Sequence, residues 1–304
     1  MRFHRFPLLL VFALIAPFSF AQQTTSSTPQ ALALLQQSLA ALTGGQSLTD
    51  VTLSGTARRI VGSNDESGSA VLKAIAAGAG RMDVTFPSGP RSELQNSAGA
   101  GPLGFWSGPD GVSHPISNHN LMTDSAWFFP ALMFARLNSP QGYVVSYIGQ
   151  ETRNGQPVVH LSAIQQFPNL TPKAVSAMQH LSQTEIFLDP STNFPLALAF
   201  NVHPDNDAFL DIPVEIRFSD YRSASSFGVA AGFSLPSASS PQIPFHIQKF
   251  LNNSLLLDFQ AQTVSLNSGL SPTDFVVAGL QTGSSPPPAS SAVAVSDSAR
   301  EVRP

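Results

Sequence analysis

The chain has 304 residues, of which 42% are hydrophobic and only 11% charged, with a formal net charge of −4 and no cysteine. The lack of cysteine excludes disulfides and thiol chemistry, and the acidic balance argues against nucleic acid as a partner. Because soluble domains carry about 25% charged residues, the surface must be rich in uncharged polar groups, which suits a weakly charged β protein.

The first 21 residues have the pattern of a secretory signal. Arg2 and Arg5 precede an apolar run at 7–18 that is too short to span a bilayer, and Ser19-Phe20-Ala21 provides the small residues of a cleavage site. No cysteine follows for lipid attachment, so we expect an exported periplasmic protein cut after Ala21; an uncleaved anchor helix is the alternative. Cleavage removes two of the 15 basic residues, which leaves 13 against 19 acidic ones and a net charge of −6.

The two ends of the mature chain differ from the rest. Residues 22–28 form a short polar lead, and residues 281–304 form a tail rich in proline and serine. The tail has too little apolar content to offset the cost of ordering, so we expect it to be disordered. Between these ends no change of composition, linker or fixed repeat divides the chain. We therefore expect one domain over residues 29–280.

The domain is predicted to begin with a helix. Thr28 can cap it, Pro29 suits its first turn, leucines recur every three or four residues, and Gly44-Gly45 ends it. After this helix the apolar period changes to two, which indicates an antiparallel meander. Its strand candidates are residues 51–57, 70–75, 81–86 and 91–97.

Two more helices are expected among the strands. The segment Leu121 to Leu137 is apolar around most of its circumference, with Pro130 breaking the backbone hydrogen-bond ladder near its middle. A shorter helix is predicted from Pro172 to Leu181, with Thr171 as its cap.

The second half of the chain is otherwise predicted to be strand. Asn154-Gly155 lies between the strand candidates 143–149 and 158–164 and is the strongest short hairpin signal in the chain. Strict alternation recurs at 214–219 and 255–259. We count about twelve half-buried strands, which fit one strongly curved antiparallel sheet or a barrel.

The order of these elements also matches a known pattern. After the signal, the Leu-rich helix and the aromatic helical insertion come the hairpin Tyr147–Leu161 and the strand–turn–strand Glu185–Pro195, continued by Ile216–Arg222 and Ile243–Ile247. Over about residues 29–275 the chain resembles the periplasmic lipoprotein carrier (LolA-like) superfamily. This resemblance implies an α+β fold, an open, strongly curved antiparallel half-barrel with helices covering its concave face. It also implies a hydrophobic cavity for the acyl chains of a lipoprotein or lipid.

The candidate ligand-binding residues lie in the central apolar helix. A sheet that curls without closing needs an apolar cover, and an incomplete fit leaves a cavity. The residues expected to line it are Trp127, Phe128, Phe129, Leu132 and Met133. For each of them, a place in the packed core is the alternative. The superfamily closes its lid with an arginine on an early strand; Arg58 and Arg59 lie in such a strand, but neither is assigned that role.

Catalytic and metal-binding motifs are weak by comparison. The chain has no Gly-x-Ser-x-Gly elbow and no Ser-x-x-Lys pair, so we predict neither an enzyme nor a cofactor. His114 and His119, with Asp110 and Asp124 nearby, could supply metal ligands, but Pro115 and the spacing favour a solvated polar loop. The segment 203–207 has the oxygen density of a calcium loop but lacks its glycine and terminal glutamate, so a hairpin turn is predicted.

The predicted function is to bind or carry a lipid, a lipoprotein acyl chain or a similar hydrophobic ligand in the periplasm, with a membrane-bound envelope protein as a candidate partner. One alternative is an envelope interaction module of the same fold, whose interior is filled by side chains and which binds a protein through a sheet edge. The other alternative is a hydrolase on a β scaffold.

Overall fold

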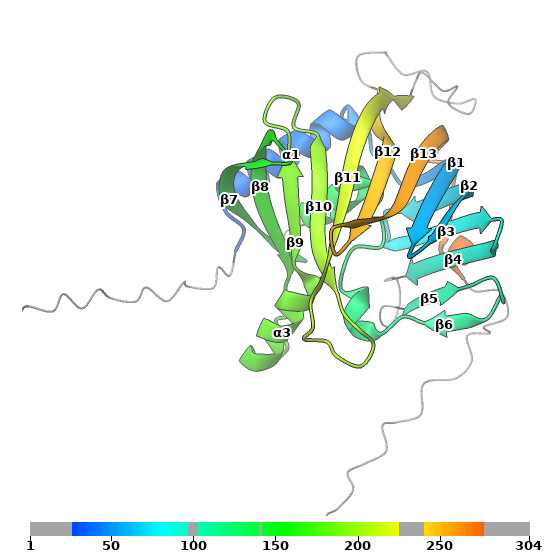
Figure 1. The fold of residues 1–304 in the computed structure, drawn as a ribbon. Helices are drawn as coiled ribbons and strands as arrows, with labels where there is room; N and C mark the ends of the chain where they lie inside the picture. Colours follow the sequence, from blue (N-terminus) through cyan, green and yellow to red (C-terminus); the bar gives the residue numbers. More distant parts are fainter. Residues whose placement is uncertain (1–25, 97–102, 140–141, 225–239, 277–304) are drawn as a thin grey trace, which may run out of the picture.

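A single curved antiparallel sheet organises the computed structural model, which describes residues 26–96, 103–139, 142–224 and 240–276. Within these residues thirteen strands follow the order β6-β5-β4-β3-β2-β1-β13-β12-β11-β10-β9-β8-β7 (Figure 1). The strands are β1 (Asp50–Val61), β2 (Asn64–Ile75), β3 (Ala79–Phe86), β4 (Gly89–Asn96), β5 (Leu103–Ser107), β6 (Ser113–Pro115), β7 (Tyr143–Arg153), β8 (Gln156–Gln165), β9 (Thr184–Leu188), β10 (Pro195–Val202), β11 (Ile212–Ser223), β12 (Gln242–Leu251) and β13 (Ser254–Leu266).

The sheet is open, as predicted. Its two meanders, β1–β6 and β7–β13, are joined by the antiparallel pairing of β1 with β13. Among the described strands, β6 and β7 form the two ends of the sheet. The β1–β13 ladder shifts register between Ser54 and Gly55, and a Cβ on Gly55 would lie 2.0 Å from the backbone oxygen of Gln260. Such a bulge increases twist, and only glycine permits this close approach.

The predicted turn and cap chemistry is confirmed. Asn154 and Gly155 have φ angles of 50° and 79° and connect β7 to β8, as a two-residue hairpin turn requires. Helix α1 (Pro29–Thr43) begins with the Thr28 hydroxyl accepting a hydrogen bond from the Ala31 amide at 3.3 Å and ends at Gly44 in the left-handed region. Helix α3 (Pro172–Ser182) has the same kind of cap at Thr171. These features are local, so sequence alone specifies them.

The central helix is shorter than predicted. Helix α2 (Pro130–Leu137) follows a short 3-10 turn, η1 (Asn118–Leu121), and Trp127, Phe128 and Phe129 precede the helix in a turn. Pro130 begins the helix instead of interrupting it, because the first residue of a helix has no helical partner for its N–H and proline lacks that N–H. Proline also disfavours helical angles in the residue before it, and Phe129 has φ and ψ of −132° and 84°. The prediction of a continuous helix from Leu121 was therefore wrong.

Helix α1 crosses the concave side of the sheet. It contacts both β7 and β12, which lie five strands apart, and it also contacts α2 (Figure 1). Five strand spacings amount to about 24 Å on a flat sheet, and a helix of this length extends about 22 Å. The main core fills the space between these helices and the inner faces of the strands, with Leu35, Phe134 and Phe259 at its centre. The predicted half-barrel with helices across its concave face is confirmed.

The expected export signal at 1–21 and the expected tail at 281–304 lie outside the described residues. In the described ranges, no helix has the length and apolarity needed to cross a lipid bilayer.

A charge cluster on β7 and β11 leads to a first prediction. Glu215 accepts hydrogen bonds from Arg217 Nε at 2.6 Å and from Arg153, whose guanidinium lies 4.0 Å from the centre of the Phe187 ring. Burial raises the pKa of Glu215, but the hydrogen bonds from Arg217 and Arg153 and their charges outweigh it, so the pKa lies below its ordinary value of 4.5. The ionised carboxylate therefore stabilises the fold.

Glu215→Gln should lower the free energy of unfolding by about 1 kcal/mol at pH 7, because Glu215 keeps some solvent contact. Since the folded pKa is depressed, the wild-type advantage is complete above the unfolded pKa and disappears as the pH falls through the folded pKa. Urea unfolding at pH 7 and pH 3 should show the gap closing in acid. Glu151→Gln, at a half-exposed glutamate of β7, is the control and should cost less. A gap that stays constant with pH would contradict the prediction.

Candidate ligand-binding site

The five predicted site residues lie together in the main core. The exposed fractions of Trp127, Phe128, Phe129, Leu132 and Met133 are all 6% or less. The rings of Trp127 and Phe128 meet edge to face, with centroids 5.5 Å apart. A cavity that these two residues line has a volume of only about 10 Å³, about the space of one water molecule. The five residues therefore form a packed inner wall in this conformation.

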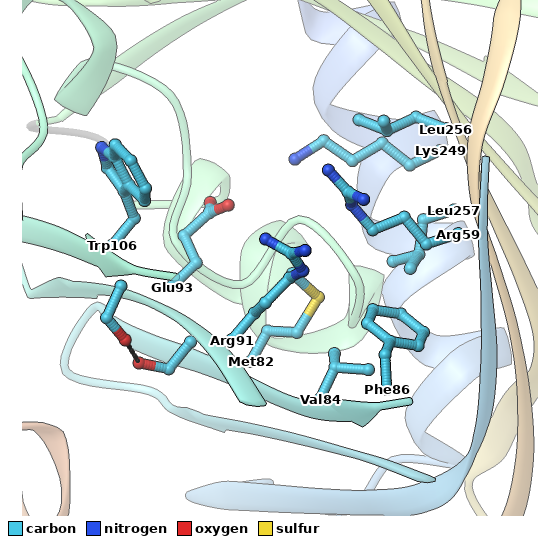
Figure 2. A pocket seen from close by; sticks show the side chains of 12 residues that line it. Arg59, Met82, Val84, Phe86, Arg91, Glu93, Trp106, Lys249, Leu256 and Leu257 are labelled. Carbon is cyan, nitrogen blue, oxygen red and sulfur yellow. Dashed lines mark hydrogen bonds between the residues drawn. The ribbon is translucent and has the colours of Figure 1, made fainter. Parts of the chain in front are cut away.

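A larger pocket of about 290 Å³ opens beside this wall. Its lining comes from two groups of strands on either side of β2, since β3, β4 and β5 on one side face β1, β12 and β13 on the other (Figure 2). Only strong curvature brings these strands to opposite sides of one space. The lining residues are Arg59, Met82, Val84, Phe86, Arg91, Ser92, Glu93, Trp106, Ser107, Lys249, Leu256 and Leu257.

The pocket combines an apolar wall with charged side chains. Met82, Val84 and Phe86 project from alternate positions of β3 and form one apolar side, and Leu256 and Leu257 lie across from them (Figure 2). Trp106 on β5 closes the far side and leaves 47% of its surface exposed. Large exposed aromatics beside an apolar hollow are typical of binding surfaces.

Three cationic side chains reach into the same space. Figure 2 shows the charged ends of Arg59, Arg91 and Lys249 directed toward the interior of the pocket, with the Glu93 carboxylate opposite them. Just outside the lining, Glu66 Oε1 lies 3.5 Å from Arg59 and 3.8 Å from Arg91.

Two neighbouring groups, Glu66 and Trp127, contact these cations. Hydrogen bonds from Ser88, with the charges of Arg91 and Arg59, hold the pKa of Glu66 below its ordinary value despite desolvation. The Lys249 ammonium lies 4.7 Å from the centre of the Trp127 ring, a cation–π contact that joins the pocket to the inner wall. Both tryptophans of the chain, Trp106 and Trp127, thus adjoin the pocket.

The two early-strand arginines lie in different surroundings. Arg58 is half exposed, and its Nε donates to Asp65 Oδ1 at 2.8 Å. Arg59, the next residue, reaches the pocket. The link between α2 and the sheet is made by Arg136, whose Nε donates to Asp124 at 2.9 Å and whose Nη1 donates to the backbone oxygens of Ile75 and Ala76. This ion pair was not predicted, although Asp124 and Arg136 are the only charged residues between 121 and 137.

The predicted metal-ligand candidates are not brought together. His114 stacks on Trp106 with ring centroids 4.4 Å apart, the His119 ring nitrogen meets the backbone oxygen of Pro204, and Asp124 pairs with Arg136. Asp110 caps its own turn through the amide of Val112. The interpretation of this segment as a loop was wrong at His114 and Pro115, which lie in the short strand β6 paired with β5, and at His119, which lies in η1.

A different group of possible metal ligands meets near α3. The ligand atoms of His180, His203 and Asp211 all lie within 4.8 Å of one another. The Asp211 carboxylate is 2.9 Å from His180 Nε2 and 3.0 Å from His203 Nε2, and although burial raises its pKa, these hydrogen bonds hold that pKa below its ordinary value. Two imidazoles and a carboxylate suit a divalent transition metal. His203 lies in the segment predicted to be a turn, and the structure confirms a loop between β10 and β11 there.

Comparisons with known proteins concern the fold. No protein-family model matches the sequence, and no curated protein matches it. Among solved structures, one similar chain is a LolA superfamily protein from Nitrosomonas europaea, with 12% identity over 81% of this chain and 97% of that chain and a TM-score of 0.47. Another is a DUF1329 family protein from Desulfovibrio piger, with 11% identity over 84% of this chain and 100% of that chain and a TM-score of 0.46. The likeness is one of fold.

Proposed function

We propose that the protein binds a lipid, an acyl chain or a similar hydrophobic ligand in the pocket between β3–β5 and β12–β13, and that it carries this ligand in the bacterial envelope. The observation that carries the proposal is the pocket itself, an open space of about 290 Å³ with an apolar wall and an exposed tryptophan. This volume is at the lower end of the range of ligand sites. Each methylene buried there contributes about 0.8 kcal/mol, so an acyl chain needs few polar contacts.

The inner-wall residues have a defined part in this proposal. The Trp127 ring makes a cation–π contact with the Lys249 ammonium, and the Phe128 ring meets the Trp127 ring edge to face. Phe129, Leu132 and Met133 lie deeper in the same core. We propose that this wall fixes the back of the pocket and touches the ligand first at Trp127. The proposed periplasmic location rests on the signal pattern at 1–21 and on the expected cleavage after Ala21.

A partner-binding role is the second candidate. The two edge strands of the sheet give little support to binding of a partner strand. At β7, the Thr28 amide donates to Val145 and the Val145 amide donates to Ser27. At the other edge, β6 has only three residues and includes Pro115. Such edges are protected against strand addition. The feature that favours a protein or membrane partner is the loop before β11, where Phe209 is 83% exposed and Leu210 55%.

The test of the proposal is ligand binding by a variant with a filled pocket. Leu256 is only partly buried and lines the pocket, so Leu256→Trp should occupy the space while the fold survives. Displacing several methylenes at about 0.8 kcal/mol each should weaken the binding of a fluorescent fatty acid more than about tenfold. Titration would be followed by probe emission and by quenching of Trp106 and Trp127.

The matched control is Leu255→Trp, at the preceding and similarly buried residue of β13, which does not line the pocket. It should bind the probe like the wild type, and melting curves of all three proteins should agree. A wild-type protein that binds no probe would contradict the proposed function. Equal binding by Leu256→Trp would place the ligand elsewhere.

A further inference from the structure

We infer that the pocket selects anionic amphiphiles, binding a carboxylate or phosphate headgroup through Arg59, Arg91 and Lys249 while the apolar wall holds the chain. The inference rests on the proposed function and narrows its ligand to one chemical class. Three of the 12 lining residues are basic, whereas the whole chain has 15 basic residues in 304. Composition alone therefore does not account for the positive charge in the pocket.

The three cations are brought together by the fold. Arg59 comes from β1, Arg91 from β4 and Lys249 from β12, and their charged ends converge in Figure 2. The carboxylates beside them are the lining residue Glu93 and the adjacent Glu66. Three positive groups against two negative ones leave an excess of one positive charge, in a protein whose net charge is −4. Such a local excess attracts anions.

The cations also have donors to spare. Arg59 and Arg91 contact a single oxygen of Glu66, at 3.5 and 3.8 Å, and Arg91 Nη2 also donates to Ser88 Oγ at 3.2 Å. The Arg91 Nε atom is buried and has no acceptor within the described residues. In the same part of the chain, Lys249 makes no ion pair, and its ammonium rests on the Trp127 ring. A guanidinium has five N–H donors, so this arrangement leaves room for a headgroup with two or more acceptor oxygens.

Because the pocket has both cationic and apolar lining residues, it should bind an amphiphile more tightly than a neutral chain or a free anion. The planar fork of a guanidinium can donate to two oxygens of a carboxylate or phosphate, and partial burial makes this attraction stronger than it is in water. The chain of the ligand would lie along Met82, Val84 and Phe86 and against Leu257. A neutral chain would gain only the apolar part, and a free anion only the polar part. The preferred ligand therefore has both.

The test compares ligands that differ only in charge. The neutral dye N-phenyl-1-naphthylamine would occupy the apolar pocket, and its displacement would be measured with dodecanoate and dodecanol, and with lysophosphatidylglycerol and lysophosphatidylcholine of one chain length. Each anionic member should displace the dye at a concentration at least about tenfold lower than its uncharged or zwitterionic counterpart. This preference should shrink as salt is added.

Variants of the pocket cations test whether the preference for anionic ligands arises in the pocket. Arg59→Gln and Lys249→Gln should each weaken dodecanoate binding about fivefold to tenfold and leave dodecanol unchanged. Arg58→Gln is the matched control, because Arg58 adjoins Arg59 on β1 but pairs with Asp65, which does not line the pocket. It should behave like the wild type. Equal losses for both ligands would overturn the headgroup role of Arg59 and Lys249.

The remaining outcomes separate this inference from the proposed function. Equal displacement by charged and uncharged ligands in the wild type would overturn the anionic preference and leave a hydrophobic-ligand site intact. Failure of the dye and of every lipid to bind would overturn the proposed function as well. Inorganic phosphate that binds as tightly as lysophosphatidylglycerol would show a site for free anions, and that result also contradicts an amphiphile.

Discussion

Leu132→Asp should unfold the protein. Leu132 is 1% exposed in the first turn of α2 and belongs to the main core with Phe129 and Phe134. The basic residue one turn further along α2, Arg136, is already paired with Asp124. Burying a further carboxylate without a free partner costs several kcal/mol, a large part of the roughly 5–15 kcal/mol that holds a domain together. Far-UV and near-UV circular dichroism at 20 °C, with a thermal melt, should therefore show lost tertiary structure and no cooperative transition.

The control is Ala135→Asp, one turn away on the exposed side of the same helix. It introduces the same charge into the same element, and it should lower the melting temperature by only a few degrees. A Leu132→Asp protein that melts like the wild type but no longer binds ligand would mean that α2 is a loosely packed lid. That result would support the original prediction that Phe129, Leu132 and Met133 contact the ligand directly.

The parts of the fold that sequence analysis predicted well depend on neighbouring residues. Thr28 and Thr171 cap helices because a hydroxyl two or three residues before a free amide can accept its hydrogen bond. Asn154-Gly155 forms its hairpin because both residues tolerate positive φ angles. The prediction failed at Pro130, where a proline within an apolar run was interpreted as an interruption and is in fact the first residue of α2.

The pocket was not predicted because its residues meet only through the sheet order. Arg59 and Lys249 are far apart in the chain and come together because β1 pairs with β13 and β13 with β12. No short motif encodes that pairing. The alternation of a strand does separate Arg58 from Arg59, but it does not say which of the two faces inward. The aromatic run at 127–129 is continuous in the sequence, so it was predicted as the site, and it forms the wall behind the pocket. The charged residues that line the pocket are dispersed over three strands and form no such run.

Arg136→Met should cost about 3–5 kcal/mol, because it leaves the Asp124 carboxylate buried without its cation. The Asp124 side chain is 8% exposed, and it also accepts from the Ala126 amide at 2.8 Å. Burial lowers the pKa of Arg136, but the charge and hydrogen bonds of Asp124 outweigh it and raise that pKa, so the guanidinium is charged at neutral pH. Arg136 Nη1 also donates hydrogen bonds to the backbone oxygens of Ile75 and Ala76, at the end of β2. The variant should lose the attachment of α2 to the sheet.

A double variant distinguishes the charge pair from the packing of the arginine. Adding Asp124→Asn to Arg136→Met removes the unpaired charge, so urea unfolding at pH 7 should recover part of the lost free energy. Arg58→Met removes an arginine of a half-exposed ion pair and should leave the unfolding midpoint nearly unchanged. If Arg136→Met were as stable as the wild type, the attachment of α2 would depend on its apolar residues alone. If the double variant were no more stable than Arg136→Met, the loss would come from the contacts of Arg136 with β2, not from the buried carboxylate.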